Sequence, residues 1–171
     1  MKTLWTPWRM SYISEKQVTE GRCIFETEST GGHDKSNLLL YRGALAVVML
    51  NRFPYANGHL LVAPVRHVAD ITELTEKEAN ALHGMIRESV VILRRHLQPD
   101  GFNVGLNLGT VAGAGQPDHL HYHVVPRWEG DHNYMTVLAE IRTIPEHIEK
   151  TFDRLLPDFQ ELLQKKYTDN E

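Results

Sequence analysis

The segment "HLHYHVVP", residues 119–126, constrains the fold more than any other part of this 171-residue chain. Its three histidines stand at every second position, at His119, His121 and His123. The positions that follow them are apolar or aromatic, at Leu120, Tyr122 and Val124. Because side chains alternate between the two faces of a strand, this pattern predicts a β-strand ended by Pro126, with three imidazoles on one face and core residues on the other.

A row of three imidazoles suits two kinds of chemistry. Histidine is a common zinc ligand, and a neutral imidazole can also attack phosphorus while its neighbours orient the ring and hold phosphate oxygens. The alternative is a polar strand whose histidines only face water. The preceding loop, "GTVAGAGQPD" at residues 109–118, favours an anion site, because glycines let backbone N–H groups approach a ligand closely.

The remaining pattern predicts a single α+β domain. Apolar or alternating runs at 44–50, 59–65 and 102–108 indicate further strands. Thr75 and Glu78 form a capping box that begins a helix, which Pro99, Asp100 and Gly101 end. The tail has helical periodicity, with Pro145 suited to its first turn and Pro157 expected to break or kink it.

Composition limits the partners and the compartment. The net charge of −4 gives no basic excess for a nucleic-acid polymer, and no apolar run approaches the roughly 20 residues that cross a membrane. A lone cysteine, Cys23, cannot form an internal disulfide, and residues 1–13 do not read as a signal peptide, so we expect a cytoplasmic protein. Trp5, Trp8 and Tyr12 mark an N-terminal arm that docks on its own core or on a second subunit.

Several motifs together carry a family resemblance. The string "HLHYHVV" resembles the histidine triad motif, and "LWTPWRMSYI", "LNRFPYANGHLLVAP" and "GFNVGLNLGTVAGAG" resemble the histidine triad (HIT) branch that contains diadenosine tetraphosphate phosphorylases and hydrolases. The resemblance implies one HIT domain over residues 1–171, with an arm at 1–20 and a helical extension at 144–171. It also implies an antiparallel sheet of about five strands, one long packed helix, and a homodimer that merges two sheets.

The resemblance also implies an activity. In the family the middle histidine, here His121, attacks the α-phosphate of a nucleotide and forms a nucleotidyl-imidazole intermediate, which water or inorganic phosphate then releases. His123 would contact the phosphate and assist the leaving group, and His119 would orient the loop or bind a metal. The expected substrate is a dinucleoside polyphosphate such as diadenosine tetraphosphate, with adenine nucleotides favoured.

Further positions are expected to contact the nucleotide. The candidate residues for the phosphate, ribose and base are Asn107, Gly113, Gly115, Gln116, Asn51 and Phe25. For Asn51 an Asx turn at a strand end competes with ribose binding. For Phe25 a place in the core competes with a place in the base pocket. The family also has a histidine at the position of His59, which is expected to be structural or to lie near the site.

A second site could hold structural zinc. Related branches bind zinc with Cys-x-x-Cys, a later histidine and the first triad histidine. This chain offers Cys23, Glu26, His67 and His119, so a carboxylate stands where those branches have a second thiolate. The alternative is that Cys23 is a small buried apolar residue. No organic cofactor is expected.

Three other functions remain open at the level of sequence. The chain could hydrolyse nucleoside phosphoramidates or mononucleotides, or it could bind nucleotides as a regulatory protein with weak turnover. It could also be a metal-dependent enzyme that uses all three histidines at one metal. Replacing His121 by alanine and adding a chelator distinguish these functions from covalent catalysis.

Overall fold

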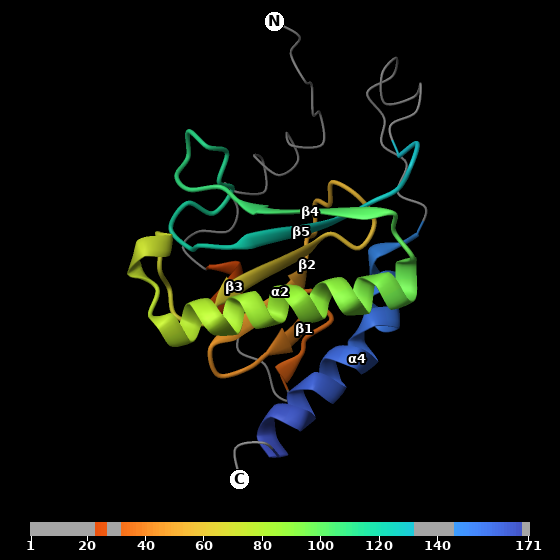
Figure 1. Ribbon diagram of the computed structural model, residues 1–171, viewed down its shortest axis with the longest axis horizontal. Helices are drawn as coiled ribbons and strands as arrows, with labels where there is room; N and C mark the ends of the chain where they lie inside the picture. The colour runs from red at the N-terminus through yellow and green to blue at the C-terminus, as the bar shows by residue number, and fades with distance from the viewer. Residues whose placement is uncertain (1–22, 27–31, 132–145, 169–171) are drawn as a thin grey trace, which may run out of the picture.

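A computed structural model describes residues 23–26, 32–131 and 146–168 (Figure 1). In chain order the elements are η1 (Ile24–Glu26), β1 (Leu39–Arg42), β2 (Ala46–Leu50), β3 (Leu60–Pro64), η3 (Ile71–Glu73), α2 (Glu76–Leu97), β4 (Gly101–Leu106), β5 (Tyr122–Arg127) and α4 (Ile148–Thr168). The five strands form one antiparallel sheet in the order β1-β2-β3-β5-β4. This architecture confirms the predicted α+β class.

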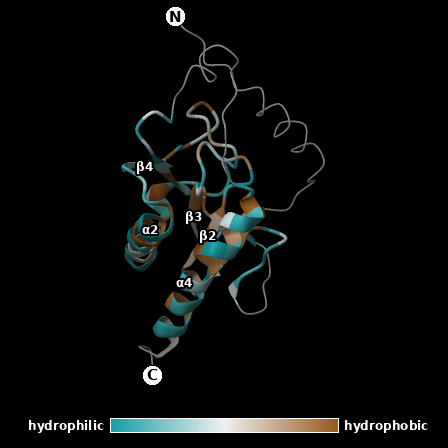
Figure 2. Cartoon of the chain, turned by 90° about the vertical axis from the view of Figure 1, so that its right-hand side faces the viewer, coloured by the Kyte–Doolittle hydropathy of each residue, from teal (hydrophilic) through white to brown (hydrophobic). Residues whose placement is uncertain are grey.

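Strands β2 and β3 are buried on both faces of the sheet. Alternate residues of β2 and β3, among them Val48 and Val62, join a large core that includes Met85 and Leu93 of α2 and Phe159 of α4. The two helices therefore cover one face, as Figures 1 and 2 show. The intervening residues of the same strands form a second cluster on the opposite face, and their members are Phe25, Leu39, Val47, Met49, Leu61 and Ala63.

The long helix begins where the capping box predicts. The side chain of Thr75 accepts from the backbone N–H of Glu78, and the carboxylate of Glu78 accepts from the backbone N–H of Thr75. Glu78 also receives two hydrogen bonds from Arg66, which ties the start of the helix to the chain that leaves β3. Gln98 ends the helix in a left-handed conformation, one residue before Pro99.

Two sequence expectations about the elements were wrong in detail. The histidine segment enters the sheet only at Tyr122, so His119 and His121 precede β5, and β5 continues past Pro126 to Arg127. The tail helix runs through Pro157 without a break. Pro157 is exposed, so the carbonyl that it leaves unpaired can bond to water, while Phe152, Leu155 and Phe159 hold the helix on the core.

Some predicted segments lie outside the described residues. These are the aromatic arm at 1–20, Pro145, and the last residues of the predicted tail, 169–171. Within the described part of the chain, no helix is both long enough and apolar enough to span a membrane.

Candidate functional site

The histidine triad lies on the face of the sheet that the helices do not cover. His123 pairs with Leu61 of β3 and Gly105 of β4, and Leu61 belongs to the cluster opposite α2 and α4. Leu120 and Val124, expected in the core, are buried. His119 and His121 are buried as well, at 1% and 6% exposure, so the imidazoles are not a row of water-facing side chains.

The backbone fixes the orientation of His121. Its Nδ1 lies 2.9 Å from the carbonyl oxygen of His119. A carbonyl only accepts, so Nδ1 carries the proton and Nε2 carries the lone pair. Nε2 has no hydrogen-bond partner among the described residues.

The opposite arrangement holds at His123. Its Nδ1 lies 2.9 Å from Nε2 of His59, and Nδ1 of His59 accepts from the backbone N–H of Tyr55 at 3.1 Å. Because the N–H of Tyr55 is a donor, His59 must carry its own proton on Nε2 and donate it to His123. A neutral His123 then holds its proton on Nε2, so the two neighbouring triad rings present a lone pair and an N–H respectively.

Burial keeps these rings uncharged at neutral pH. It lowers the pKa of His59 to about 3 and that of His123 to about 4, and neighbouring imidazoles act in the same direction. Burial also lowers the pKa of His121, although its bond to the His119 carbonyl opposes the shift. A neutral ring is the form that an imidazole nucleophile needs.

Two aromatic rings flank the triad. Phe25 is fully buried, and its centroid lies 4.9 Å from that of His119 and 5.3 Å from that of His121. Tyr55 packs on His59 at 4.8 Å and lies 5.9 Å from His123. Phe25 thus lies in the core beneath the triad, and its predicted role in a base pocket stays a prediction.

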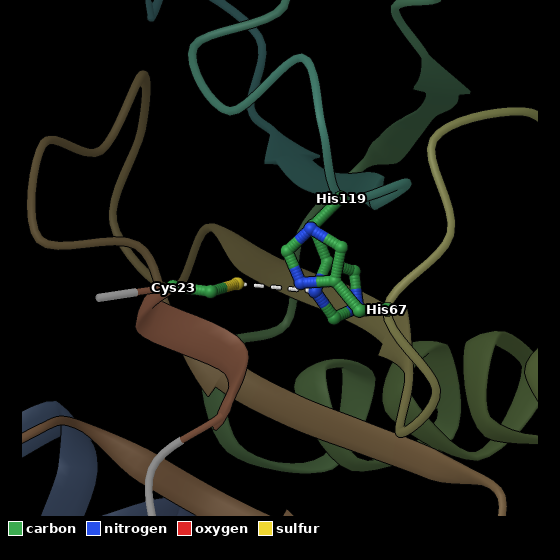
Figure 3. A group of neighbouring side chains, drawn as sticks. All are labelled: Cys23, His67 and His119. Carbon is green, nitrogen blue, oxygen red and sulfur yellow. Dashed lines mark hydrogen bonds between the residues drawn. The ribbon is translucent and has the colours of Figure 1, made fainter. Parts of the chain in front are cut away.

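A second cluster meets the triad at His119. The candidate ligand atoms of Cys23, His67 and His119 lie within 4.8 Å of one another, and Figure 3 shows the three side chains converging. Nε2 of His119 donates to the carbonyl of Pro64 at 2.9 Å, so Nδ1 holds the lone pair that faces Cys23 Sγ at 3.1 Å. Burial raises the pKa of the Cys23 thiol and lowers that of His119.

The carboxylate of Glu26 lies beside this cluster. It accepts from Nδ1 of His67 at 2.8 Å, which leaves Nε2 of His67 with the lone pair. A histidine that donates to a carboxylate through one nitrogen and keeps the other free is the usual arrangement of a zinc ligand. The donor set therefore fits zinc, and three of the four predicted ligands form the cluster.

Three of the predicted nucleotide-binding residues, Asn51, Asn107 and Gly113, make local hydrogen bonds. Oδ1 of Asn51 accepts from the N–H of Phe53 at 3.0 Å, which is the Asx turn of the alternative reading, and its Nδ2 lies 3.3 Å from Nδ1 of His59. The side chain of Asn107 donates to the carbonyl of Gly113, and the backbone N–H of Gly113 donates to the carbonyl of Thr110. Phosphate or ribose contacts by Asn51, Asn107, Gly113, Gly115 and Gln116 stay predictions.

Three contributors to the site were not assigned a role from sequence. They are the Nε2 donor of His59, the ring and N–H of Tyr55, and the carbonyl of Pro64. The motif "NRFPYANGH" draws attention to the first two, but only the pairing of β3 with β5 brings His59 to His123.

Comparison with known proteins identifies the family. Residues 33–130 match the HIT domain. Over 157 residues the chain is 38% identical to the AP-4-A phosphorylase of Mycobacterium tuberculosis, covering 88% of this chain and 80% of that protein. It is 31% identical over 93 residues to a bis(5'-nucleosyl)-tetraphosphatase [asymmetrical] of Schizosaccharomyces pombe, covering 54% of this chain and 50% of that one.

A solved structure shows the same fold. The zinc-bound histidine triad family protein of Mycobacterium smegmatis has a TM-score of 0.59 and 26% identity, covering 75% of this chain and 87% of that one. The fold, the triad and the matches over most of the sequence agree, and the chain belongs to the HIT domain family.

Proposed function

We propose that this protein is a nucleotidyl hydrolase or phosphorylase that cleaves a dinucleoside polyphosphate at the α-phosphate through His121. The observation that carries the proposal is the bond between Nδ1 of His121 and the His119 carbonyl, which leaves Nε2 as the nucleophile. The names of the relatives from M. tuberculosis and S. pombe support a diadenosine tetraphosphate-like substrate.

The first step joins His121 to the nucleotide. Nε2 of His121 forms a bond to the α-phosphorus while the bond from phosphorus to the bridging oxygen breaks. The departing oxygen takes the proton that His123 holds on Nε2. The positive charge that develops on His121 is stabilised by the carbonyl of His119, because Nδ1–H donates to it.

The second step releases the nucleotide. Water or inorganic phosphate gives a proton to Nε2 of His123 and attacks the phosphorus, and the bond between phosphorus and His121 breaks. Both rings return to their starting protonation states. Dividing one displacement into two is the advantage of covalent catalysis.

Product analysis tests this proposal. Diadenosine tetraphosphate should give ATP and ADP when inorganic phosphate is the acceptor, and ATP and AMP when water is. His121→Ala should lower turnover by roughly three orders of magnitude or more, as loss of a nucleophile does in other covalent enzymes. His83→Ala, at an exposed histidine of α2, is the matched control and should have no effect.

Two results would contradict the proposal. Unchanged turnover in His121→Ala would show that His121 is not the nucleophile. If mass spectrometry of wild-type enzyme, quenched rapidly during turnover, found no nucleotidyl adduct on His121, the reaction would not proceed through the covalent intermediate. Nucleotide binding without turnover would instead indicate a regulatory protein.

We also propose that zinc binds at the cluster of Cys23, His67 and His119. When bound, it would tie Cys23, which directly precedes η1, to the segments that follow β3 and precede β5. The free lone pairs of the two histidines and the zinc-bound relative from M. smegmatis support this proposal. Elemental analysis should find one zinc per chain, and Cys23→Ser should lose it.

We infer that the protein is a homodimer in the cytoplasm. β4 forms one edge of the sheet, and its residues Asn103, Val104 and Gly105 are exposed, which leaves an edge able to pair with a second copy. The single cysteine, Cys23, is a free thiol, as expected in a reducing compartment.

A further inference from the structure

We propose that the metal site has three protein ligands, Cys23, His67 and His119, and a fourth position open to a small exogenous anion, while Glu26 supports His67 from outside. The inference deepens the zinc part of the proposed function and rests on it. It differs from the ligand set expected from sequence, in which Glu26 replaces a cysteine as the fourth ligand.

The roles of the nitrogen atoms support this assignment. Nε2 of His119 is committed to the carbonyl of Pro64, and Nδ1 of His67 is committed to the carboxylate of Glu26. Each ring therefore has one nitrogen held by an acceptor and one nitrogen free to bind a metal. Carboxylates and carbonyls that accept from the outer nitrogen of a ligating histidine are the regular supporting partners of zinc sites.

Chain geometry explains why Glu26 takes the outer position. The N–H of Glu26 donates to the carbonyl of Cys23 at 3.1 Å, so one 3-10 turn carries both residues, and side chains three residues apart lie on the same side of such a turn. A cysteine at position 26 would end at Sγ, one atom beyond Cβ. The longer glutamate side chain extends farther and meets Nδ1 of His67 instead.

Among the residues that the structure describes, the cluster is open on the side of Glu26. The side chains of His67 and Glu26 are 43% and 50% exposed, whereas His119 is 1% exposed and forms the buried wall. A metal held there would have protein on one side and solvent on the other. Zinc with three protein ligands characteristically keeps its fourth position for solvent or a small ligand.

The charges indicate which ligand the open position takes. One thiolate and two neutral imidazoles leave a net charge of +1 on a divalent ion, so a small anion is favoured as the fourth ligand. The carboxylate of Glu26 accepts from Nδ1 of His67, so it offsets part of this charge from outside the ligand shell.

Cobalt substitution tests the inference without reference to turnover. Co²⁺ is added anaerobically to the metal-free full chain, and the absorption bands are recorded with and without azide. The wild type should show a thiolate-to-cobalt band that Cys23→Ser lacks, and azide should shift its visible bands. Glu26→Ala should keep the azide response and bind Co²⁺ roughly 10–100-fold more weakly, as expected when a supporting partner is lost.

Glu26→Cys tests the open position from the other direction, because its thiolate can bind the metal there. It should supply a fourth ligand, strengthen the thiolate band and abolish the azide response. Glu129→Ala, at an exposed glutamate remote in sequence, controls for a general loss of charge and should behave as the wild type. Circular dichroism of each variant establishes that it is folded.

Two outcomes would overturn the inference in distinguishable ways. A wild-type spectrum that ignores azide, together with a response gained in Glu26→Ala, would make Glu26 a direct ligand. Failure of Co²⁺ to produce the thiolate band in the wild type would overturn the metal site altogether. Neither outcome affects the adduct on His121, which is measured separately.

Discussion

At the scale of single residues, His59 is the sharpest test of how the site distributes its protons. His59→Leu removes the donor to Nδ1 of His123, so His123 can move its proton away from Nε2. Turnover of diadenosine tetraphosphate should fall by about 100-fold, which is typical for loss of a general acid. His59→Gln, whose side-chain amide can still donate, should recover part of that activity.

The leaving group separates this role from a structural one. With the p-nitrophenyl ester of AMP, whose leaving group needs no proton, His59→Leu should be nearly as fast as the wild type. Equal losses on both substrates would show that His59 does not act through the protonation of the leaving group.

The buried histidines also make stability depend on pH. The folded pKa values of His59 and His123, about 3 and about 4, lie below the ordinary value of 6.5. The unfolded chain therefore binds protons that the folded chain refuses, and stability falls as pH drops below 6.5. Between pH 6.5 and pH 5 each of these histidines should lower the free energy of unfolding by up to about 2 kcal/mol.

Urea unfolding at pH 7 and pH 5 measures this loss. The drop should be smaller in His59→Gln by up to about 2 kcal/mol, because this variant lacks the proton uptake of His59 and keeps that of the other buried histidines. A drop of the same size in both proteins would assign the pH dependence to other groups.

The sequence predicted the chemical groups of the site better than their contacts. The spacing of His119, His121 and His123 marked the triad, and family resemblance gave Cys23 and His67 as possible metal ligands. The contact between His59 and His123 spans 64 positions and depends on the pairing of β3 with β5, which one sequence does not specify. Local patterns predict side-chain types, and strand register decides which of them meet.

At the scale of elements, Pro157 in α4 gives a direct test. Proline in a helix interior costs about 3 kcal/mol relative to alanine, and this one lies on the exposed side of a helix held by buried residues. Pro157→Ala should therefore stabilise the protein by about 1–3 kcal/mol in urea unfolding. Gln164→Ala on the same helix should change stability by no more than a few tenths. A destabilised Pro157→Ala would mean that the helix needs the proline geometry.

The elements differ in how well the sequence predicted them. α2 was predicted because its capping box and its end signals are local. We expected a break or a kink at Pro157, and the helix does not break there, because the packing of Phe152, Leu155 and Phe159 outweighs the lost hydrogen bond. β1 was not located from sequence, since four residues with no flanking alternation give little signal.

At the scale of the whole molecule, β4 is the place to test the proposed dimer. Val104 lies in the middle of this edge strand and is 47% exposed. Val104→Lys should place a charge at a paired edge and convert the dimer to a monomer in sedimentation at micromolar concentration. Val91→Lys, at an exposed residue of α2, is the control and should leave the dimer intact. A monomeric wild type would contradict the dimer.

The main-chain carbonyl that holds His121 has a consequence for inheritance. Every amino acid at position 119 supplies that oxygen, so a mutation can change the side chain of His119, and with it the proposed zinc site, without removing the acceptor that orients His121. The proposed metal site and the orientation of the proposed nucleophile can therefore be lost independently.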